Sequence, residues 1–415
     1  MPPHEPSRHP LVTAESILAA RLRLASVIKA VPTYHADSLS KLTGRQVLIK
    51  PEFRQRTGSF KIRGAYNLIC QLPAGQEVVA ASAGNHAQGV ALAASMTGRH
   101  ATIFMPEGAS LPKINATRAY GATVRLEGRV LDDSLDAARS YASDSGATFV
   151  APFDHLEVIA GQATIGLELA EEAPDAEVIL VPVGGGGLLA GVAAAIASAW
   201  RSGQAAGNRP RVVGVEAAGA ASMTAALAAG RPVALTSMAT MADGIAVRCV
   251  SESTLAHAEA FVDEVVTVDE EEISRAMLLA VERLKAVVEP AGAVGLAAIA
   301  SGRLEGNGPV VVVLSGGNVD PMLLGKLIDH GLSAAGRYLT LRVVVGDRAG
   351  SLASVTADLA RLGLNVLDVE HHRNGRPLGV GQVEIQVTVE TRDRSHHREV
   401  IEALEAAGHH AIEVD

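Results

Sequence analysis

Short apolar runs alternate with longer Ala-rich stretches through the first three quarters of the chain, and this alternation predicts strands separated by helices. The strands are predicted at residues 78–82, 101–105, 123–126, 178–183, 212–215 and 310–315, and the helices at 87–97, 134–143, 161–173 and 188–201. Strands that alternate with helices form right-handed βαβ units around a parallel sheet. The sequence therefore predicts an α/β fold whose ligands bind at the carboxyl ends of the strands.

The hydrophobic pattern changes at residues 331–337, a stretch of small residues that we interpret as a linker. Beyond it, residues 338–415 show the patterns of strand, helix, strand, strand, helix and strand in that order. This βαββαβ order is typical of the ferredoxin-like fold. We therefore expect a large domain over residues 15–330 and a small domain after the linker. Residues 1–14 are polar and proline-rich, which predicts a disordered tail.

Charge and cysteine content exclude several classes of function. The net charge is -9 and no basic block is present, which argues against a nucleic-acid partner. Cys70 and Cys249 are far apart, so a disulfide framework is not expected and a reducing cytoplasm is the predicted location. Residues 178–200 are apolar and long enough to span a membrane. Pro182 and four glycines divide that segment into a strand and a helix, so no membrane partner is predicted.

Four consecutive glycines, Gly184 to Gly187, separate a predicted buried strand from a predicted helix. Consecutive glycines let the backbone approach an anion and direct N–H groups toward it, while the following helix contributes its positive end. The loop lacks the GxGxxG pattern of dinucleotide sites and the Lys-Ser/Thr pair of nucleotide-triphosphate loops. The segment predicts a phosphate site for another kind of ligand, and the alternative is a tightly packed turn.

The predicted phosphate site changes the interpretation of one lysine. Lys61 lies in the stretch TGSFKIRGAYN and, taken alone, would be interpreted as a surface charge. A phosphate site and a lysine in one α/β chain together suggest pyridoxal 5'-phosphate, whose aldehyde forms a Schiff base with a lysine. The segments SAGNH, with Asn85, and SGGN, with Ser315, offer polar groups for the cofactor ring and for the carboxylate of an amino acid.

These motifs together resemble the serine/threonine dehydratase family. TGSFKIRGA, SAGNHAQG, VGGGGL, DGIAV, VEPAGAVG and LSGGN occur in the order and at roughly the spacing of that family. The resemblance covers about residues 15–330 and implies a pyridoxal-phosphate enzyme of the tryptophan-synthase-β type, fold type II. Such a fold has two parallel-sheet subdomains, the smaller at roughly residues 45–155. Residues 338–415 resemble a single ACT domain, a regulatory amino-acid-binding fold.

The resemblance also implies roles for individual residues. Lys61 corresponds to the catalytic Schiff-base lysine, Phe60 packs beside the cofactor, and Asn85 forms a hydrogen bond to the ring hydroxyl. Ser315 corresponds to the hydroxyl that faces the pyridine nitrogen. The residues expected to hold the phosphate are Gly184, Gly185, Gly186, Gly187 and Leu188, and those expected in the loop that holds the substrate carboxylate are Ser82, Ala83, Gly84 and His86.

The reaction implied by the resemblance is a β-elimination, in which L-threonine is dehydrated and deaminated to 2-oxobutanoate and ammonia, and L-serine to pyruvate. Lys61 acts as the base only if its pKa falls from about 10.4 toward neutrality, as burial or a nearby cation such as Arg63 causes. Racemases of this family carry a serine in place of Ala83, so we expect dehydration rather than racemisation. A serine-preferring dehydratase and a non-catalytic amino-acid sensor remain alternatives.

The ACT-like module predicts regulation. Its loop at residues 346–352 precedes a predicted helix, whose backbone N–H groups could receive an effector carboxylate. The resemblance implies inhibition by isoleucine, opposed by valine, at a site between two copies, and therefore a homo-oligomer, either a dimer or a tetramer. The alternative is a module that only dimerises the chain. Glu216 lies in a stretch similar to the family's cation site, but Ser222 replaces an acidic ligand, so no metal is predicted.

Overall fold

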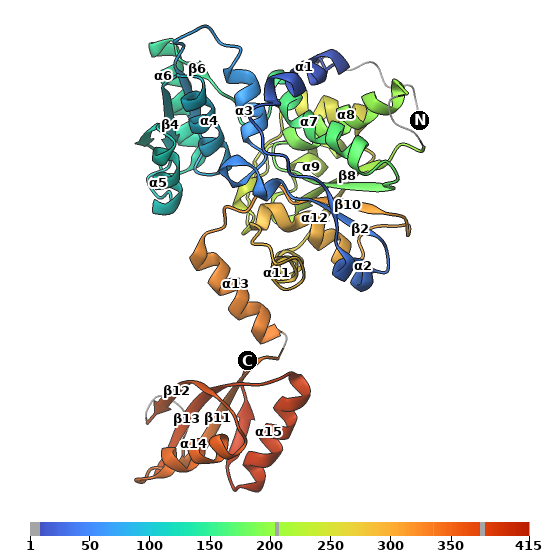
Figure 1. Cartoon of the computed structure of the whole chain (residues 1–415). Helices are drawn as coiled ribbons and strands as arrows, with labels where there is room; N and C mark the ends of the chain where they lie inside the picture. Colours follow the sequence, from blue (N-terminus) through green and yellow to red (C-terminus); the bar gives the residue numbers. More distant parts are fainter. Residues whose placement is uncertain (1–8, 204–206, 335, 374–377, 415) are drawn as a thin grey trace. The chain divides into compact units, whose positions relative to one another are not determined.

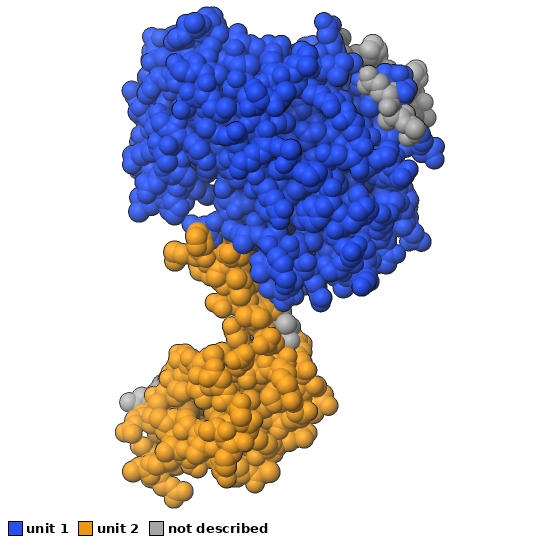
Figure 2. Space-filling view, viewed as in Figure 1, with its two compact units in different colours: residues 1–320 blue, residues 321–415 orange. Residues whose placement is uncertain are grey.

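The chain divides into two compact units, residues 1–320 and residues 321–415, which Figure 2 shows in blue and orange. The computed structural model describes residues 9–203, 207–334, 336–373 and 378–414. Each unit has a hydrophobic core of its own and combines helices with sheet (Figure 1). The predicted α/β class is therefore confirmed, and each unit is described below by itself.

A six-stranded sheet forms the centre of the first unit. Its strands lie in the order β1, β2, β10, β7, β8, β9, and every neighbouring pair is parallel except β1 and β2. The strands span Tyr34–His35 (β1), Val47–Lys50 (β2), Val178–Pro182 (β7), Arg211–Ala217 (β8), Glu264–Val268 (β9) and Val310–Val313 (β10). The central strands β7 and β10 are buried along their whole length, as is usual for apolar strands that helices cover on both faces.

Helices pack around this sheet (Figure 1). They span Ala14–Leu24 (α1), Asp37–Thr43 (α2), Leu156–Glu172 (α7), Gly187–Arg201 (α8), Ser222–Ala229 (α9), Glu252–Phe261 (α10), Glu270–Leu279 (α11) and Pro290–Ala300 (α12). Helices α7 and α8 are in close contact, because a Cβ atom added to Gly191 would lie only 2.7 Å from the backbone of Ile159 and Ala163. Helix α7 begins five residues before the predicted start, where the His155 side chain accepts a hydrogen bond from Glu157 N.

A four-stranded parallel sheet forms the smaller part of the first unit, in the order β5, β4, β3, β6. Its elements are α3 (Ile62–Ile69), β3 (Val78–Ala81), α4 (Asn85–Met96), β4 (Ala101–Met105), α5 (Leu111–Ala119), β5 (Thr123–Leu126), α6 (Leu131–Ser145) and β6 (Thr148–Phe149). The predicted start of this subdomain near residue 45 was wrong, because β2 pairs with β10 in the larger sheet. All four residues of β2 are buried, which suits an interior strand.

The predicted disordered tail at residues 1–14 was wrong for its last part. Val12 is buried, and its N–H donates a hydrogen bond of 3.0 Å to Nε2 of His257. Thr13 caps helix α1 by accepting a hydrogen bond from Ser16 N. The chain is therefore held in place from a few residues before the helix begins, and residues 1–8 lie outside the described part.

The second unit has the predicted βαββαβ order, which is confirmed. It begins with helix α13 and continues with an antiparallel sheet in the order β12, β13, β11, β14. Its elements are α13 (Pro321–Ala334), β11 (Tyr338–Gly346), α14 (Ser351–Arg361), β12 (Val366–His372), β13 (Gln382–Glu390), α15 (Arg394–Ala406) and β14 (His410–Glu413). Residues 374–377, between β12 and β13, lie outside the described residues.

The boundary between the two units differs from the predicted linker at residues 331–337. Helix α13 continues through Ala334, and the division of the chain falls after Asp320, ten residues earlier than predicted. Pro321 stands at the first helical position, where its missing N–H costs nothing. Small residues therefore extend a helix here, and Ala335 lies outside the described residues.

Within the described residues, no helix is long and apolar enough to cross a membrane. The apolar segment at residues 178–200 folds as strand β7, a glycine turn and helix α8. Its lack of charge reflects burial inside the first unit, where nearly all of its side chains are shielded from solvent.

Candidate active site

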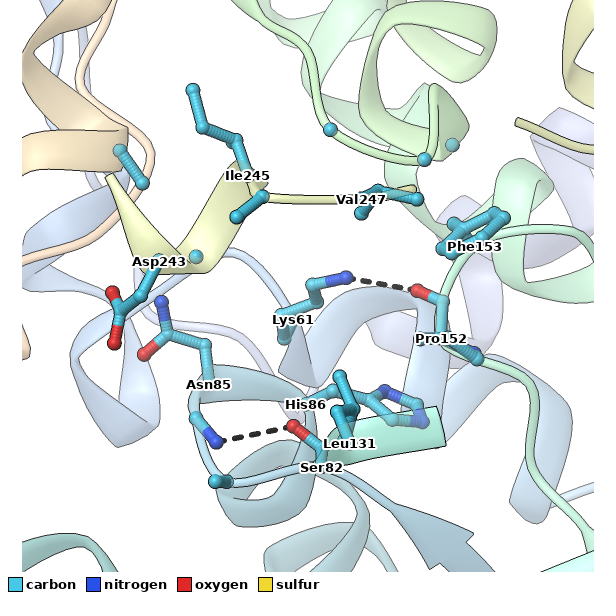
Figure 3. A pocket seen from close by; sticks show the side chains of 18 of the residues that line it. Lys61, Ser82, Asn85, His86, Leu131, Pro152, Phe153, Asp243, Ile245 and Val247 are labelled. Atoms are coloured by element: carbon cyan, nitrogen blue, oxygen red, sulfur yellow. Dashed lines mark hydrogen bonds between the residues drawn. The ribbon is translucent and has the colours of Figure 1, made fainter. Parts of the chain in front are cut away.

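A pocket of about 760 Å³ lies in the first unit, where both sheets contribute residues to its walls (Figure 3). Segments that follow the carboxyl ends of β3, β7 and β10 reach it, as expected for parallel sheets. All residues to which the sequence analysis assigned a cofactor or substrate role line this pocket: Phe60, Lys61, Ser82, Ala83, Gly84, Asn85, His86, Gly184, Gly185, Gly186, Gly187, Leu188 and Ser315.

Lys61 immediately precedes helix α3 and extends its side chain into the pocket (Figure 3). Its amine donates a hydrogen bond of 2.8 Å to the carbonyl oxygen of Pro152 and lies 5.2 Å from the centre of the Phe60 ring. Burial of the amine lowers the pKa of Lys61 to about 8, and the Glu289 carboxylate opposes this change only in part. A lysine with such a pKa is partly neutral near physiological pH, as a nucleophile or base must be.

Arg63 does not supply the cation that the sequence suggested as a second cause. Its guanidinium is fully buried and lies between two carboxylates, with Nη2 2.7 Å from Oε1 of Glu52 and Nη1 2.5 Å from Oε1 of Glu168. Lys50 approaches Glu168 as well, at 2.7 Å. These contacts neutralise Arg63, so the low pKa of Lys61 results from burial.

The loop between β3 and α4 forms one wall of the pocket. Ser82 Oγ accepts a hydrogen bond of 3.1 Å from Gly84 N, which fixes the turn that leads into α4 (Figure 3). His86 donates through Nε2 to the carbonyl oxygen of Val150 at 2.8 Å, and burial lowers the pKa of His86 to about 3. Because this histidine is neutral, the first N–H groups of α4 are the positive end that the loop offers to an anion.

The four-glycine loop fits a phosphate group. A Cβ atom on Gly185 would lie 2.2 Å from the ring of Phe153, and one on Gly187 would lie 2.6 Å from the backbone oxygen of Phe153. Gly186 has φ +88°, a conformation that favours glycine. The first hydrogen bond of α8 runs from Ala190 N to Gly186 O, so the N–H groups before it have no acceptor within the helix. This combination of close packing and available N–H groups is that of an anion cradle.

Ser315 lies just beyond strand β10 and next to the segment that carries Lys61. The backbone N–H of Phe60 donates to Ser315 O at 3.1 Å, and Gly317 N donates to Gly58 O at 2.9 Å. Ser315 is almost completely buried. The two loops therefore hold each other, and the serine and the lysine have fixed positions in the same pocket.

Sequence analysis missed four residues of the site. Glu289 and Asn318 stand within motifs that were recognised, but no role was assigned to them, although a polar residue inside a glycine-rich motif is a usable signal. Pro152 and Phe153, which contact Lys61 and the glycine loop, belong to no recognised motif. Burial raises the pKa of Glu289 to about 7, so this carboxyl group is partly protonated at neutral pH.

Glu216 is engaged within the protein. Its carboxylate accepts hydrogen bonds from Met223 N at 2.7 Å, from Thr224 N at 2.9 Å and from the Thr224 hydroxyl at 2.7 Å. These bonds cap the start of helix α9. In the part of the chain that the structure describes, no group of three or more His, Cys, Asp or Glu side chains could hold a metal ion.

Comparison with known proteins defines the family of this fold and pocket. The model of the pyridoxal-phosphate dependent enzymes matches residues 24–316, and the ACT domain model matches residues 339–408. The chain therefore belongs to the pyridoxal-phosphate dependent enzyme family and carries a C-terminal ACT domain.

The relatives are similar along most of their length. An L-threonine ammonia-lyase of Thermotoga maritima is 43% identical over 403 residues, or 96% of this chain and 98% of the relative. The solved structure of threonine deaminase isoform 2 from Solanum lycopersicum is 34% identical with a TM-score of 0.69, covering 79% of this chain and 93% of its own. Maize serine racemase is 32% identical with a TM-score of 0.71, covering 78% and 99%. The predicted family, fold type II and cofactor are thus confirmed.

Proposed function

We propose that the chain is a threonine ammonia-lyase, or threonine dehydratase, which converts L-threonine to 2-oxobutanoate and ammonia. The observation that carries this proposal is the position of Lys61 in one pocket with the four-glycine loop and the loop at residues 82–86. The similarity to an L-threonine ammonia-lyase over nearly the whole chain supports the same activity.

Each part of the pocket has a chemical task in this proposal. Pyridoxal phosphate, when bound, supplies the electron sink that makes the α-proton of an amino acid acidic. The loop from Gly184 to Leu188 would hold its phosphate, Phe60 would pack beside it, and Asn85 would bind its ring hydroxyl. The N–H groups at residues 83–86 would bind the substrate carboxylate. The Lys61 amine removes the α-proton and returns a proton to the β-hydroxyl, which leaves as water. The enamine product then hydrolyses to the 2-oxo acid and ammonia.

Two residues favour elimination over racemisation. Ala83 lines the pocket with a methyl group, so this position has no hydroxyl that could return a proton to the other face of the substrate. Ser315 would offer a neutral hydroxyl to the pyridine nitrogen. Unlike a carboxylate, a serine does not hold that nitrogen protonated, and weaker delocalisation of the negative charge favours loss of the β-hydroxyl.

The second candidate is a serine-preferring dehydratase that makes pyruvate. The two substrates differ by one methyl group, which is worth about 1–3 kcal/mol in an apolar pocket. The test is kcat/KM for L-threonine and for L-serine, measured with the cofactor-loaded chain. A higher value for threonine supports the proposal, and a higher value for serine replaces it with the second candidate. If neither reaction occurs, the result favours the alternative of a non-catalytic amino-acid sensor.

The second unit supports a proposal about regulation. We propose that its ACT domain binds a branched-chain amino acid, with isoleucine as inhibitor and valine opposing it, and that the chain works as a homo-oligomer, a dimer or a tetramer. The loop at residues 346–352 would receive the effector carboxylate, because helix α14 begins directly after Gly350. The proposed location is the cytoplasm, for which the two free cysteines, Cys70 and Cys249, give support.

A further inference from the structure

We infer that Asn318 and Glu289 are positioning residues, which hold the side-chain amide of Asn85 in a single orientation toward the ring hydroxyl of the cofactor. The inference rests on the proposed function, in which Asn85 is the partner of that hydroxyl. Four residues form the arrangement, here called the amide relay: Thr57, Asn318, Asn85 and Glu289. The relay connects four motifs that are separated in the sequence.

The backbone carbonyl of Thr57 identifies the donor atom of the Asn318 amide. The Asn318 amide approaches Thr57 O at 2.7 Å, and because a carbonyl oxygen only accepts hydrogen bonds, the atom that faces it is the nitrogen, Nδ2. The same nitrogen lies 2.7 Å from the Asn85 amide. An amide nitrogen carries two hydrogens, so it donates one to each neighbour. The Asn85 atom at this end is therefore the acceptor, Oδ1.

The other end of the Asn85 amide is then its nitrogen. Nδ2 of Asn85 lies 2.6 Å from Oε1 of Glu289, to which it donates one hydrogen. The opposite orientation would place two nitrogen donors against each other at Asn318 and two oxygen acceptors against each other at an ionised Glu289. The first conflict persists even when Glu289 is protonated. The relay therefore permits one orientation and leaves a second Nδ2 hydrogen of Asn85 available.

Two glycines leave the space that the relay occupies. A Cβ atom on Gly316 would lie 2.1 Å from Oε1 of Glu289 and 3.0 Å from Nδ2 of Asn85. A Cβ atom on Gly58 would lie 2.5 Å from Oδ1 of Asn318. Glu289 is also almost completely buried, which makes its hydrogen bond to Asn85 costly to lose. The absence of a side chain at Gly58 and Gly316 therefore makes room for Asn318 and Glu289 in their positions.

The available hydrogen has a chemical consequence. Asn85 lines the same pocket as Lys61 (Figure 3). A hydrogen bond donated to a ring oxygen stabilises its deprotonated form and lowers its pKa. If the amide were inverted, an acceptor would replace the donor at that position and the pKa of the ring hydroxyl would rise. The orientation of Asn85 thus sets the protonation state of the bound cofactor.

The experiment reverses the relay in two steps. In Asn318→Asp the donor to Asn85 becomes an acceptor of the same size, which favours the inverted amide but leaves it facing the Glu289 carboxylate. In Asn318→Asp combined with Glu289→Gln, the glutamine nitrogen donates to the inverted amide, so both ends of the Asn85 amide are satisfied again. Thr57 O loses its Asn318 donor in both variants, so this loss does not distinguish them. The measurements are the pH titration of the cofactor absorbance in each holoenzyme without substrate, and its thermal unfolding.

The double variant is expected to recover thermal stability relative to Asn318→Asp, while the midpoint of its absorbance titration stays at least about one pH unit above wild type. If Asn318 and Glu289 had only a structural role, the double variant would recover both the thermal stability and the titration midpoint of the wild type. Glu289→Gln alone keeps an acceptor for Asn85, so its midpoint should not rise. Asn307→Asp makes the same chemical change at an exposed position before β10 and should leave the spectrum unchanged.

Two results would overturn the inference. One is a double variant that titrates as the wild type does, and the other is an Asn318→Asp holoenzyme with an unchanged titration. Failure of the proposed function is recognised separately. In that case the wild-type chain, mixed with pyridoxal phosphate, shows no absorption band that Lys61→Ala abolishes, and it does not convert threonine.

Discussion

The pKa of Lys61 is lowered because its amine is buried. Arg63, a buried cation two residues away in the sequence, is neutralised by two carboxylates, and the influence of Glu289 favours the protonated amine. The amine is held at 2.8 Å from the carbonyl of Pro152, so its position is set before any ligand arrives. Burial, rather than a specific ion pair, thus distinguishes Lys61 from the lysines on the surface.

This setting predicts the pH dependence of cofactor capture. Only a neutral amine attacks the aldehyde of pyridoxal phosphate, and the pKa of Lys61 is lowered to about 8. The rate at which the apoprotein captures the cofactor should therefore rise with pH and level off above about pH 8. Stopped-flow absorbance measures this rate. A midpoint near that of a surface lysine, about 10.4, would contradict the assignment of burial as the cause.

A second prediction at this scale concerns Ala83. Its methyl group offers no proton donor, so the wild-type chain should release very little D-serine from L-serine while it forms pyruvate. Ala83→Ser places a hydroxyl in the pocket wall, and the ratio of D-serine to pyruvate should then rise by about tenfold or more. Chiral chromatography of the products gives this ratio. Ala83→Val is the control for added side-chain volume, because valine carries no exchangeable proton, and an equal rise in it would point to altered packing.

Site residues that lie in short motifs could be predicted from the sequence. Contacts between residues that are far apart in the sequence could not. Lys61, Asn85 and the four glycines lie in short patterns whose chemistry is local. Asn85 meets Glu289 and Asn318 across 204 and 233 positions, and such pairings follow from the folded chain alone. The effect expected from Arg63 failed for the same reason, since its two carboxylate partners could not be read from neighbouring residues.

At the scale of elements, a buried ion-pair network joins the segment of Lys61 to the larger sheet. Arg63, near the start of α3, contacts Glu52 before the lysine loop and Glu168 on α7, and Glu168 in turn contacts Lys50 on β2. Arg63 and Glu52 are both fully buried. The network therefore fixes helix α3, and with it the backbone of Lys61, against helix α7 and strand β2.

Arg63→Met tests the contribution of this network. The substitution leaves Glu52 as a buried charge without its partner, which costs about 3–5 kcal/mol in the free energy of unfolding. Arg21→Met is the matched control, because Arg21 and Glu171 form an exposed pair that is worth at most about 1 kcal/mol. Chemical denaturation of both variants compares the two costs. Equal losses of stability would show that the buried network does not anchor α3.

The six strands and four helices predicted for the first unit are present as β3, β4, β5, β7, β8 and β10 and as α4, α6, α7 and α8, because their apolar patterns repeat with clear periods. Other helices of that unit, such as α3 and α12, were not predicted. Strand β2 was missed since it is short and ends in a lysine, a residue that is rarely buried. In the fold, Lys50 is fully buried and its charge is matched by Glu168 and Glu172. The linker was misplaced because the small residues after residue 330 suit the end of a helix as well as a loop.

At the scale of the whole molecule, the chain combines a catalytic unit with an ACT domain, and this combination predicts regulation. Isoleucine should lower kcat/KM for threonine, and valine should reverse the effect. Gly350 has φ +93° directly before helix α14, so Gly350→Ala strains the proposed effector loop. The variant should need several-fold more isoleucine for the same inhibition while its uninhibited activity is unchanged. If isoleucine and valine alter neither activity nor thermal unfolding of the wild type, the ACT domain has another role.

The central claim is that Lys61 is the covalent anchor and base of a threonine dehydratase. Its most direct test is the formation of 2-oxobutanoate and ammonia from L-threonine by the pyridoxal-phosphate-loaded chain and by Lys61→Ala. We predict that the two products form in equal amounts with the wild type, and that the variant loses both this reaction and the absorption band of the lysine-bound cofactor. A Lys61→Ala variant that retains the band and the reaction, or a wild type that forms no 2-oxobutanoate, would contradict it.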